Sequence, residues 1–407
     1  MSEFSKLSAV EIVKGIKKKD FSATEVTKAS ISRMEILDKE LHTYCTPTPK
    51  LALKAAGVVD KKISNNEDPG PLAGVPVGIK DLVSTKGIKT VSGSYFYKDF
   101  IPEEDDVCVE RLKNAGAIVL GKTNAPEFGY SGVGHNPVFE TTRNPWNTDL
   151  TPGGSSAGSC ASVVTGISPF AIASDGGGSI RIPSSLSGTY GMKASMGRVP
   201  LYPGCRDERY PGVSSWESIE HIGPVSNTVK DAALMLSVIS GPDDRDRHSL
   251  PKADFNWVDS VRTDIKGCKI GLSMDWGYAA VDQEVREIIL KAAKIFEKDL
   301  GCEIIEDNPG WKNPYNDFWA LVILESDLKG MRKLDMDNPG KMSPHLSGLI
   351  NRPWTAEDLT NATIGRKHVV NCMWKFMRKY DFIITPTLAC PAFAIHTQGP
   401  EKIDGRM

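Results

Sequence analysis

Two glycine-rich clusters that each carry serine are the residues of this chain whose types and spacing could do chemistry. The first occupies residues 153–159 (GGSSAGS) and the second residues 175–181 (DGGGSIR). Glycine loses more backbone entropy on folding than any other residue, so this density indicates backbone that turns sharply or lies close to another group. A run of backbone N–H donors ending at a serine could form an oxyanion hole beside its own nucleophile.

A serine is a weak nucleophile unless a neighbouring base removes its proton. Lys80 is the most interesting base, because Ile79 and Leu82 flank it in an apolar, strand-like run. Burial there would lower the pKa of the ammonium towards the range in which a neutral amine exists. The plainer interpretation is a lysine that extends from a strand end to water, and Lys80 taken alone favours it.

Histidine and cysteine are weaker candidates for this chemistry. None of the seven histidines stands in a nucleophile-elbow or chymotrypsin-like context, and we interpret His135 and His221 as structural. The eight cysteines are scattered, with no C-x-x-C pair and no clustering with histidine, so neither a disulfide framework nor a structural zinc site is expected. Cys160, beside the first glycine cluster, fits a small packing residue better than a nucleophile.

The elements that must position these residues alternate between helix and strand. Capping boxes at Ser8 with Glu11 and at Ser22 with Glu25 predict two opening helices. The apolar runs 75–82, 117–121, 170–174, 269–272, 303–305 and 382–384 predict strands, and helices are predicted over 106–114, 156–165, 228–240, 282–300 and 355–380. This alternation predicts an α/β protein, in which 241–267 is either a linker or a surface excursion.

Composition excludes several classes of function. The 407 residues carry Lys+Arg 49 against Asp+Glu 51, a net charge of -2 that provides no general attraction to nucleic acid or to an anionic membrane. Residues 1–22 contain no uninterrupted apolar region, so neither a signal peptide nor a membrane anchor is expected. No apolar run elsewhere reaches spanning length, and we expect a cytoplasmic protein.

Taken together, the motifs closely resemble the amidase signature family, whose catalytic unit is Ser-cisSer-Lys. The matching residues are the run GVPVGIKD that ends at Asp81, the two glycine clusters, the run GKTNAPEF over 121–128, and Gly223-Pro224-Val225. The resemblance is dense from about Pro71 to Gly241 and sparser to Thr385-Pro386-Thr387. A match of this density over this span is not a chance event.

The resemblance implies a role for each residue in the motifs. Ser179 would be the nucleophile that forms an acyl-enzyme, Ser155 the bridging serine after a cis peptide bond from Gly154, and Lys80 the ultimate base. The N–H groups of the implied oxyanion hole are those of Gly176, Gly177, Gly178 and Ser179. Asp175 and Arg181 would hold the loop in place, Ser156 would help to fix the lysine, and no metal or organic cofactor is implied.

The resemblance also implies one large α/β domain over 1–407, with a central mixed β-sheet covered by helices on both faces. We expect a helical cover over 1–65, a catalytic core over 70–241, and an α/β remainder over 242–407. Family members usually continue beyond the Thr-Pro-Thr strand with a segment that completes the sheet, whereas twenty residues follow Thr387 here. The segment from Cys205 to Glu220 lacks an obvious family counterpart, and two interpretations are open, surface decoration or an overhang above the substrate entrance.

The leading functional hypothesis is an amidase that cleaves a small or aryl acyl amide to acid and amine or ammonia, with side activity on esters or carbamates. One alternative is the glutaminase (A) subunit of a tRNA-dependent amidotransferase, which would need a partner that accepts ammonia. Another is an inactive, truncated binding protein. The expected partner of the leading hypothesis is a small-molecule amide, and a homodimer is left open.

Overall fold

The structure is a computed structural model that describes residues 3–406, without the side chain of Cys205. Its helices are η1 (Glu3–Lys6), α1 (Ala9–Lys18), α2 (Ala23–Leu41), α3 (Pro49–Ser64), η2 (Tyr95–Tyr97), α4 (Val107–Asn114), η3 (Glu127–Gly129), α5 (Ala157–Val164), α6 (Arg181–Ser187), η4 (Gly204–Arg206), α7 (Val229–Ile239), α8 (Trp257–Ser260), α9 (Gln283–Lys298), α10 (Tyr315–Leu324), α11 (Leu328–Asp337), α12 (Pro344–Ile350) and α13 (Ala356–Met377). Its strands are β1 (Tyr44–Pro47), β2 (Pro76–Lys80), β3 (Ile118–Thr123), β4 (Phe170–Ser174), β5 (Tyr190–Gly191), β6 (Ile222–Ser226), β7 (Lys269–Leu272), β8 (Glu303–Glu306) and β9 (Phe382–Ile384).

The main sheet has six strands in the order β1-β3-β2-β4-β6-β5. Strand β2 pairs in parallel with both β3 and β4, whereas β1, β6 and β5 run antiparallel to their neighbours. The predicted α/β class with a central mixed sheet is therefore confirmed. Because β2 and β4 are parallel neighbours, their carboxyl ends, Lys80 and Ser174, lie at the same edge of the sheet.

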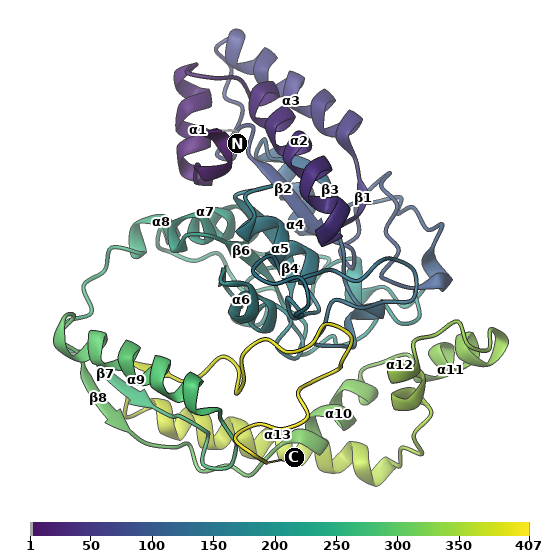
Figure 1. Cartoon of the computed structure of the whole chain (residues 1–407), viewed down its shortest axis with the longest axis vertical. Helices are drawn as coiled ribbons and strands as arrows, with labels where there is room; N and C mark the ends of the chain where they lie inside the picture. Colours follow the sequence, from purple (N-terminus) through teal and green to yellow (C-terminus); the bar gives the residue numbers. More distant parts are fainter. Residues whose placement is uncertain (1–2, 407) are drawn as a thin grey trace.

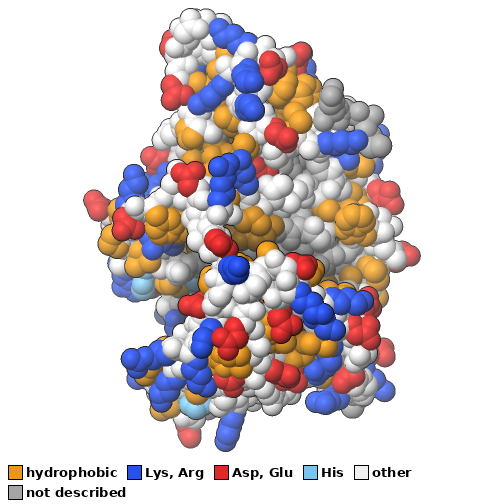
Figure 2. All heavy atoms as spheres, turned by 90° about the vertical axis from the view of Figure 1, so that its left-hand side faces the viewer, with side chains coloured by type: hydrophobic (Ala, Val, Ile, Leu, Met, Phe, Trp, Pro, Cys, Tyr) orange, Lys and Arg blue, Asp and Glu red, His pale blue; other side chains and the backbone are white. Residues whose placement is uncertain are grey.

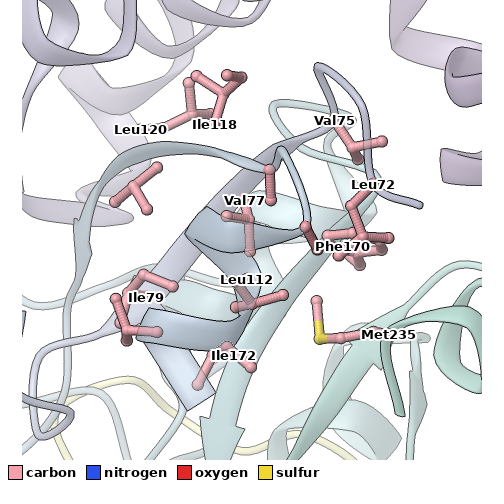
Figure 3. Packing of buried hydrophobic residues seen from close by; sticks show 14 of the residues in the cluster. Leu72, Val75, Val77, Ile79, Leu112, Ile118, Leu120, Phe170, Ile172 and Met235 are labelled. Atoms are coloured by element: carbon pink, nitrogen blue, oxygen red, sulfur yellow. The ribbon is translucent and has the colours of Figure 1, made fainter. Parts of the chain in front are cut away.

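The strands at the centre of this sheet are buried along their whole length, which explains their continuous apolar character. Figure 3 shows Val77 and Ile79 of β2 and Phe170 and Ile172 of β4 within one hydrophobic cluster. Helices complete this cluster, since Leu112 comes from α4 and Met235 from α7. The core thus fixes the strands whose ends reach the glycine clusters.

Helices α1 and α2 begin with the two predicted capping boxes. Figure 1 shows α1, α2 and α3 gathered at one end of the molecule, where α2 and α3 pack against each other and on β2 and β3. Residues 1–65 are not only helical, however, because β1 joins the edge of the main sheet by antiparallel pairing with β3. Periodicity did not indicate β1, since the strand has only four residues and contains a proline.

The last third of the chain forms a second, separate sheet at the other end of the molecule (Figure 1). Its strands are all parallel and have the order β8-β7-β9, with α9 connecting β7 to β8 as the sequence predicted. Helix α10 packs against the long helix α13. Helices α10, α11 and α12, which were not predicted, lie between the predicted strand 303–305 and the predicted helix 355–380.

The C-terminal residues return to the first glycine cluster. Thr151 and Ile395 donate backbone hydrogen bonds to Phe393 and Asp149, and Leu150 bridges Ala394. In Figure 1 this segment, drawn in yellow, runs between the second sheet and the main sheet. Residues far apart in the sequence therefore lie side by side directly before the first glycine cluster.

Acidic and basic side chains both occur across the face of the molecule that Figure 2 shows. This mixture agrees with the net charge of -2. None of the helices formed by residues 3–406 combines the length and apolar character that crossing a bilayer requires.

Candidate active site

Lys80 is the last residue of β2, and its side chain is completely buried. Its Nζ donates hydrogen bonds to Ser155 Oγ at 2.7 Å, to Ser174 Oγ at 2.9 Å and to the Ser174 carbonyl at 3.3 Å. Burial lowers the pKa of Lys80 to about 8, although the charges of Glu220 and Asp175 oppose the shift. The alternative of a lysine that extends to water is wrong, because the apolar strand keeps the amine inside.

Ser155 lies between the first glycine pair and helix α5, and its side chain is fully buried. The peptide bond that precedes it, from Gly154, is cis. A side chain on Gly154 would collide with the backbone carbonyl of Val133, so the approach of these two segments requires glycine. The hydroxyl of Ser155 is thereby held against Lys80.

Ser179 directly follows the three glycines of the second cluster, two residues before α6 begins at Arg181. The Ser156 N–H donates to the Ser179 carbonyl at 3.2 Å, so the two clusters are in direct contact. Ser179 lines a cavity of about 340 Å³, whereas Ser155 and Lys80 lie behind it, away from the lining. Of the three predicted residues, Ser179 is thus the one that faces a space of ligand size.

The glycine loop before Ser179 leaves room for no side chains. A Cβ on Gly176 would come within 2.7 Å of Trp216 and Glu220, and one on Gly177 within 2.6 Å of Phe318. The N–H groups of Gly176, Gly177 and Ser179 have no hydrogen-bond partner among the described residues. The Gly178 N–H, by contrast, donates to Asp175 Oδ1 at 2.7 Å, so three of the four N–H groups predicted for an oxyanion hole are free.

Asp175 and Arg181 clamp this loop. Arg181 donates from Nε and Nη2 to the two carboxylate oxygens at 2.9 and 2.8 Å, and the Ile180 N–H adds a third bond at 3.2 Å. Burial pushes the pKa of Asp175 upward, but Arg181 and the N–H groups of Gly178 and Ile180 bring it down to about 2. Asp175 is therefore an ionised anchor rather than a proton donor or acceptor near neutral pH.

Ser156 reaches Lys80 only through Ser174. Its Oγ donates to the Ser174 carbonyl at 3.3 Å and accepts from the Ser174 N–H at 3.4 Å. Ser174 in turn contacts Lys80 with its hydroxyl and its carbonyl. Sequence reasoning missed Ser174, although its place at the end of a strand parallel to β2 was a usable signal.

The cavity beside Ser179 is lined mainly by aromatic side chains. The rings of Trp216 and Tyr130 pack at a tilt with their centroids 4.6 Å apart, and the ring centroids of Phe318 and Trp319 of α10 lie 5.3 Å apart. The rest of the lining is glycine, serine and aliphatic residues together with Tyr315, and it includes no charged side chain among the described residues. The site is suited to an apolar or aromatic group.

The segment 205–220, for which the sequence left an overhang open, contributes to the interior. Trp216 lines the large cavity and also a smaller one of about 40 Å³ behind the site. Glu220 lines the smaller cavity with Ser174 and Asp106, and its Oε2 has no hydrogen-bond partner among the described residues. No motif marked Glu220, because its position depends on how a long irregular segment packs.

The remaining sequence candidates are structural. His221 Nδ1 lies 2.6 Å from the Ile219 carbonyl, and its Nε2 lies 3.0 Å from Lys193 Nζ, outside the serine cluster. Cys160 is buried in a small apolar cluster, and burial raises the pKa of its thiol to about 11. Within residues 3–406, no group of three or more His, Cys, Asp and Glu side chains is arranged to hold a metal ion.

Comparison with known proteins relates this geometry to one family. The amidase family matches residues 25–407. The chain is 33% identical to an acylamidase of Rhodococcus erythropolis, over 98% of this chain and 82% of that protein. It is 44% identical to the A subunit of the glutamyl-tRNA(Gln) amidotransferase of Carboxydothermus hydrogenoformans over 72% of this chain, and the match spans 58% of that protein's length.

Solved structures agree with this assignment. A bacterial aryl acylamidase of the amidase signature enzymes superposes with a TM-score of 0.91 at 30% identity, and the match covers all of this chain and 85% of that one. The fold, the spacing of the motifs and the sequence identity lead to the same group. The chain belongs to the amidase family, the group of amidase signature enzymes.

Proposed function

We propose that this protein hydrolyses carboxylic amides with an apolar or aryl group, through an acyl-enzyme on Ser179. The observation that carries the proposal is the 2.7 Å hydrogen bond from buried Lys80 to Ser155, in a loop that directly contacts the loop of Ser179. A lysine pKa of about 8 leaves a useful fraction of neutral amine near neutral pH. The site therefore contains a base without using histidine.

In the proposed first step, Ser179 Oγ attacks the amide carbonyl carbon. Its proton passes to Ser155 Oγ while Ser155 gives its own proton to neutral Lys80. The negative charge on the former carbonyl oxygen is then stabilised by the free N–H groups of the glycine loop. Each such donor contributes about 3 kcal/mol of transition-state stabilisation in comparable sites.

To complete acylation, the proton returns through the same groups to the leaving nitrogen, and the C–N bond breaks. Water then attacks the ester carbonyl of the acyl-enzyme and gives a proton to Lys80 through Ser155. The ester C–O bond breaks, the proton returns through the relay to the Ser179 oxygen, and the acid is released. Microscopic reversibility requires that the group which removes the first proton can also supply one to the amine.

The substrate class follows from the lining of the cavity. A volume of about 340 Å³ is at the lower end of ligand pockets, and the aromatic lining suits a phenyl or short alkyl group. The likeness to an acylamidase at 33% identity and to an aryl acylamidase structure supports the same class.

The second candidate is a glutaminase component of an amidotransferase, because of the 44% identity to the A subunit of such an enzyme. Free glutamine carries an ammonium and a carboxylate, and both would need charged or strongly polar partners when bound. The lining of the cavity offers no charged side chain among the described residues, which favours the apolar amide.

A substrate panel tests the proposal. Purified protein should release amine from anilides and short acyl amides, with kcat/KM at least about tenfold above that for glutamine. Glutamine turnover that exceeds anilide turnover, or that needs a co-purifying protein, would support the amidotransferase instead. No turnover, together with no labelling of Ser179 by a fluorophosphonate, would support an inactive binding protein.

A further inference from the structure

We propose that Glu220 is a positioning residue that shares the proton of Lys80 through the Ser174 hydroxyl and so sets the pH range in which Ser179 reacts. The inference rests on the proposed function, since it assumes that Lys80 is the base for Ser179. It adds the side chains of Ser174 and Glu220 to the proposed proton-transfer unit of Ser179, Ser155 and Lys80.

Glu220 lies two residues before β6, directly against the glycine loop. Its backbone N–H donates to the Trp216 carbonyl at 2.8 Å, which anchors the residue inside the 205–220 segment. The side chain is 8% exposed, and a Cβ on Gly176 would come within 2.7 Å of its Oε2. The carboxyl group therefore stands behind the loop that leads to Ser179.

The buried Glu220 carboxyl group has fewer hydrogen-bond donors around it than a buried acid needs. Its Oε2 accepts no hydrogen bond from the described residues. A buried ionised carboxylate is costly unless a charge or donors compensate for the lost water. Lys80 is the largest favourable charge that acts on it, so the two groups depend on each other.

Ser174 connects the two groups. Its Oγ accepts the hydrogen bond from Lys80 Nζ at 2.9 Å, which leaves its own proton free to donate elsewhere. The Ser174 hydroxyl lowers the pKa of Glu220, and both side chains line the small cavity of about 40 Å³. Hydrogen bonds therefore join Ser155, Lys80 and Ser174, and Glu220 lines the same small cavity as Ser174.

The titration of the two groups fits this arrangement. Burial raises the pKa of Glu220 to about 7, although the positive charge of Lys80 acts to lower it. Burial lowers the pKa of Lys80 to about 8, although the negative charge of Glu220 acts to raise it. Two coupled groups this close in pKa titrate as a pair. The other titratable or charged groups around them are Asp106, Tyr130, Cys160, Asp175, Lys193 and Arg206.

Lys80 and Glu220 act together while Ser179 attacks the carbonyl carbon. When Ser179 forms its bond to the carbonyl carbon, its proton moves to Ser155 and the Ser155 proton moves to Lys80. The new ammonium is then stabilised by the Glu220 carboxylate through the Ser174 hydroxyl. When the leaving nitrogen takes the proton back, the pair returns to its starting state.

The test is the rate at which a fluorophosphonate labels Ser179, measured against pH. In this reaction the Ser179 oxygen bonds to phosphorus, fluoride leaves, and the serine proton passes to the relay, so no amide substrate is needed. The variants are Glu220→Gln and Glu208→Gln, the second a matched control because Glu208 is an exposed carboxylate on the same segment. Thermal unfolding shows whether each variant is folded.

Glu220→Gln removes a negative charge that stabilises protonated Lys80, so neutral lysine persists to lower pH. We expect the acidic limb of its labelling profile to move down by about one pH unit. We also expect the plateau rate to fall about tenfold, because the ammonium formed in the transition state loses its counter-charge. Glu208→Gln should reproduce the wild-type profile.

A Glu220→Gln profile that superimposes on that of the wild type would overturn the inference and leave the proposed function intact. No labelling of wild-type Ser179 at any pH would overturn both. If Glu220→Gln does not fold, Ser174→Ala carries the same test, because it removes the connecting hydroxyl and keeps both charged groups. An unshifted profile of that variant would equally contradict the inference.

Discussion

At the scale of single residues, burial decides what Lys80 and Asp175 can do. Both lie at the second glycine cluster. The Lys80 ammonium donates hydrogen bonds only to hydroxyl and carbonyl oxygens, whereas the Asp175 carboxylate accepts hydrogen bonds from the Arg181 guanidinium. The pKa of Lys80 is therefore lowered to about 8 and that of Asp175 to about 2. One group can exchange protons near neutral pH, and the other stays ionised.

Activity should rise with pH through the pKa of Lys80. In the proposed mechanism the neutral amine is the active form, so kcat/KM should be low at pH 6, half-maximal near pH 8 and level off about one pH unit higher. Replacement of Lys80 by Met should remove this rise of kcat/KM with pH and lower kcat/KM by about 10³-fold or more. The check is a pH series of anilide hydrolysis, and an unchanged profile in the Lys80→Met variant would exclude the lysine as base.

Two adjacent serines provide a matched pair. Ser155 contacts Lys80 directly, whereas Ser156 acts only through Ser174. We expect Ser155→Ala to lower kcat by about 10³-fold and Ser156→Ala by about tenfold, since only the first removes a proton carrier. Steady-state kinetics of both variants are the measurement, and equal losses would contradict the separate roles.

At the scale of elements, the ends of parallel strands and the starts of helices form the site. The sequence predicted β2, β4 and α5, whereas only the family resemblance implied that Lys80 and the first cluster would meet. These elements are predictable because their apolar runs and small residues follow local rules. Glu220 and Phe318 were not predictable, since long-range packing of an irregular segment and of α10 brings them to the loop.

The Asp175 anchor can be tested by Asp175→Asn. The substitution weakens the bidentate pair with Arg181, so the oxyanion loop should lose its geometry, and we expect about 10²-fold lower kcat with KM little changed. In the native protein, Asp175 contributes stability above its unfolded pKa of 3.8 that is lost as the pH falls towards 2. The variant should therefore lose less stability than the wild type between these values in acid unfolding.

The control for this prediction is Asp68→Asn, which removes a surface carboxylate that pairs with Lys17. Its kinetics should match those of the wild type. A normal kcat in Asp175→Asn would mean that the loop holds its shape without the anchor.

At the scale of the whole molecule, the cavity lies where two distant parts of the chain meet. The glycine loops lie beside the main sheet, while α10 of the C-terminal third supplies Phe318 and Trp319. The sequence predicted the α/β units of that third but not its separate sheet or its part in the cavity. Which sheet a strand joins depends on which strand edges come together in the folded protein. The apolar pattern of a single strand in the sequence does not contain that information.

Phe318→Ala should separate substrate binding from chemistry. Loss of the ring removes apolar contact, so we expect KM for an anilide to rise about tenfold, which corresponds to about 1.4 kcal/mol. Labelling of Ser179 by a small fluorophosphonate should stay within about twofold of wild type. Trp374→Ala, on an exposed position of α13, is the control, and an unchanged anilide KM in the Phe318 variant would place the acyl or amine group elsewhere.

Peptide mass spectrometry of enzyme quenched in acid during turnover of an activated aryl ester or anilide tests directly whether Ser179 carries the acyl group. We expect one acyl group, attached to Ser179, in the wild type, and no acylated peptide in Ser179→Ala. Acylation of another residue, such as Cys160 or Ser155, or turnover by the Ser179→Ala variant at the wild-type rate, would contradict this role of Ser179.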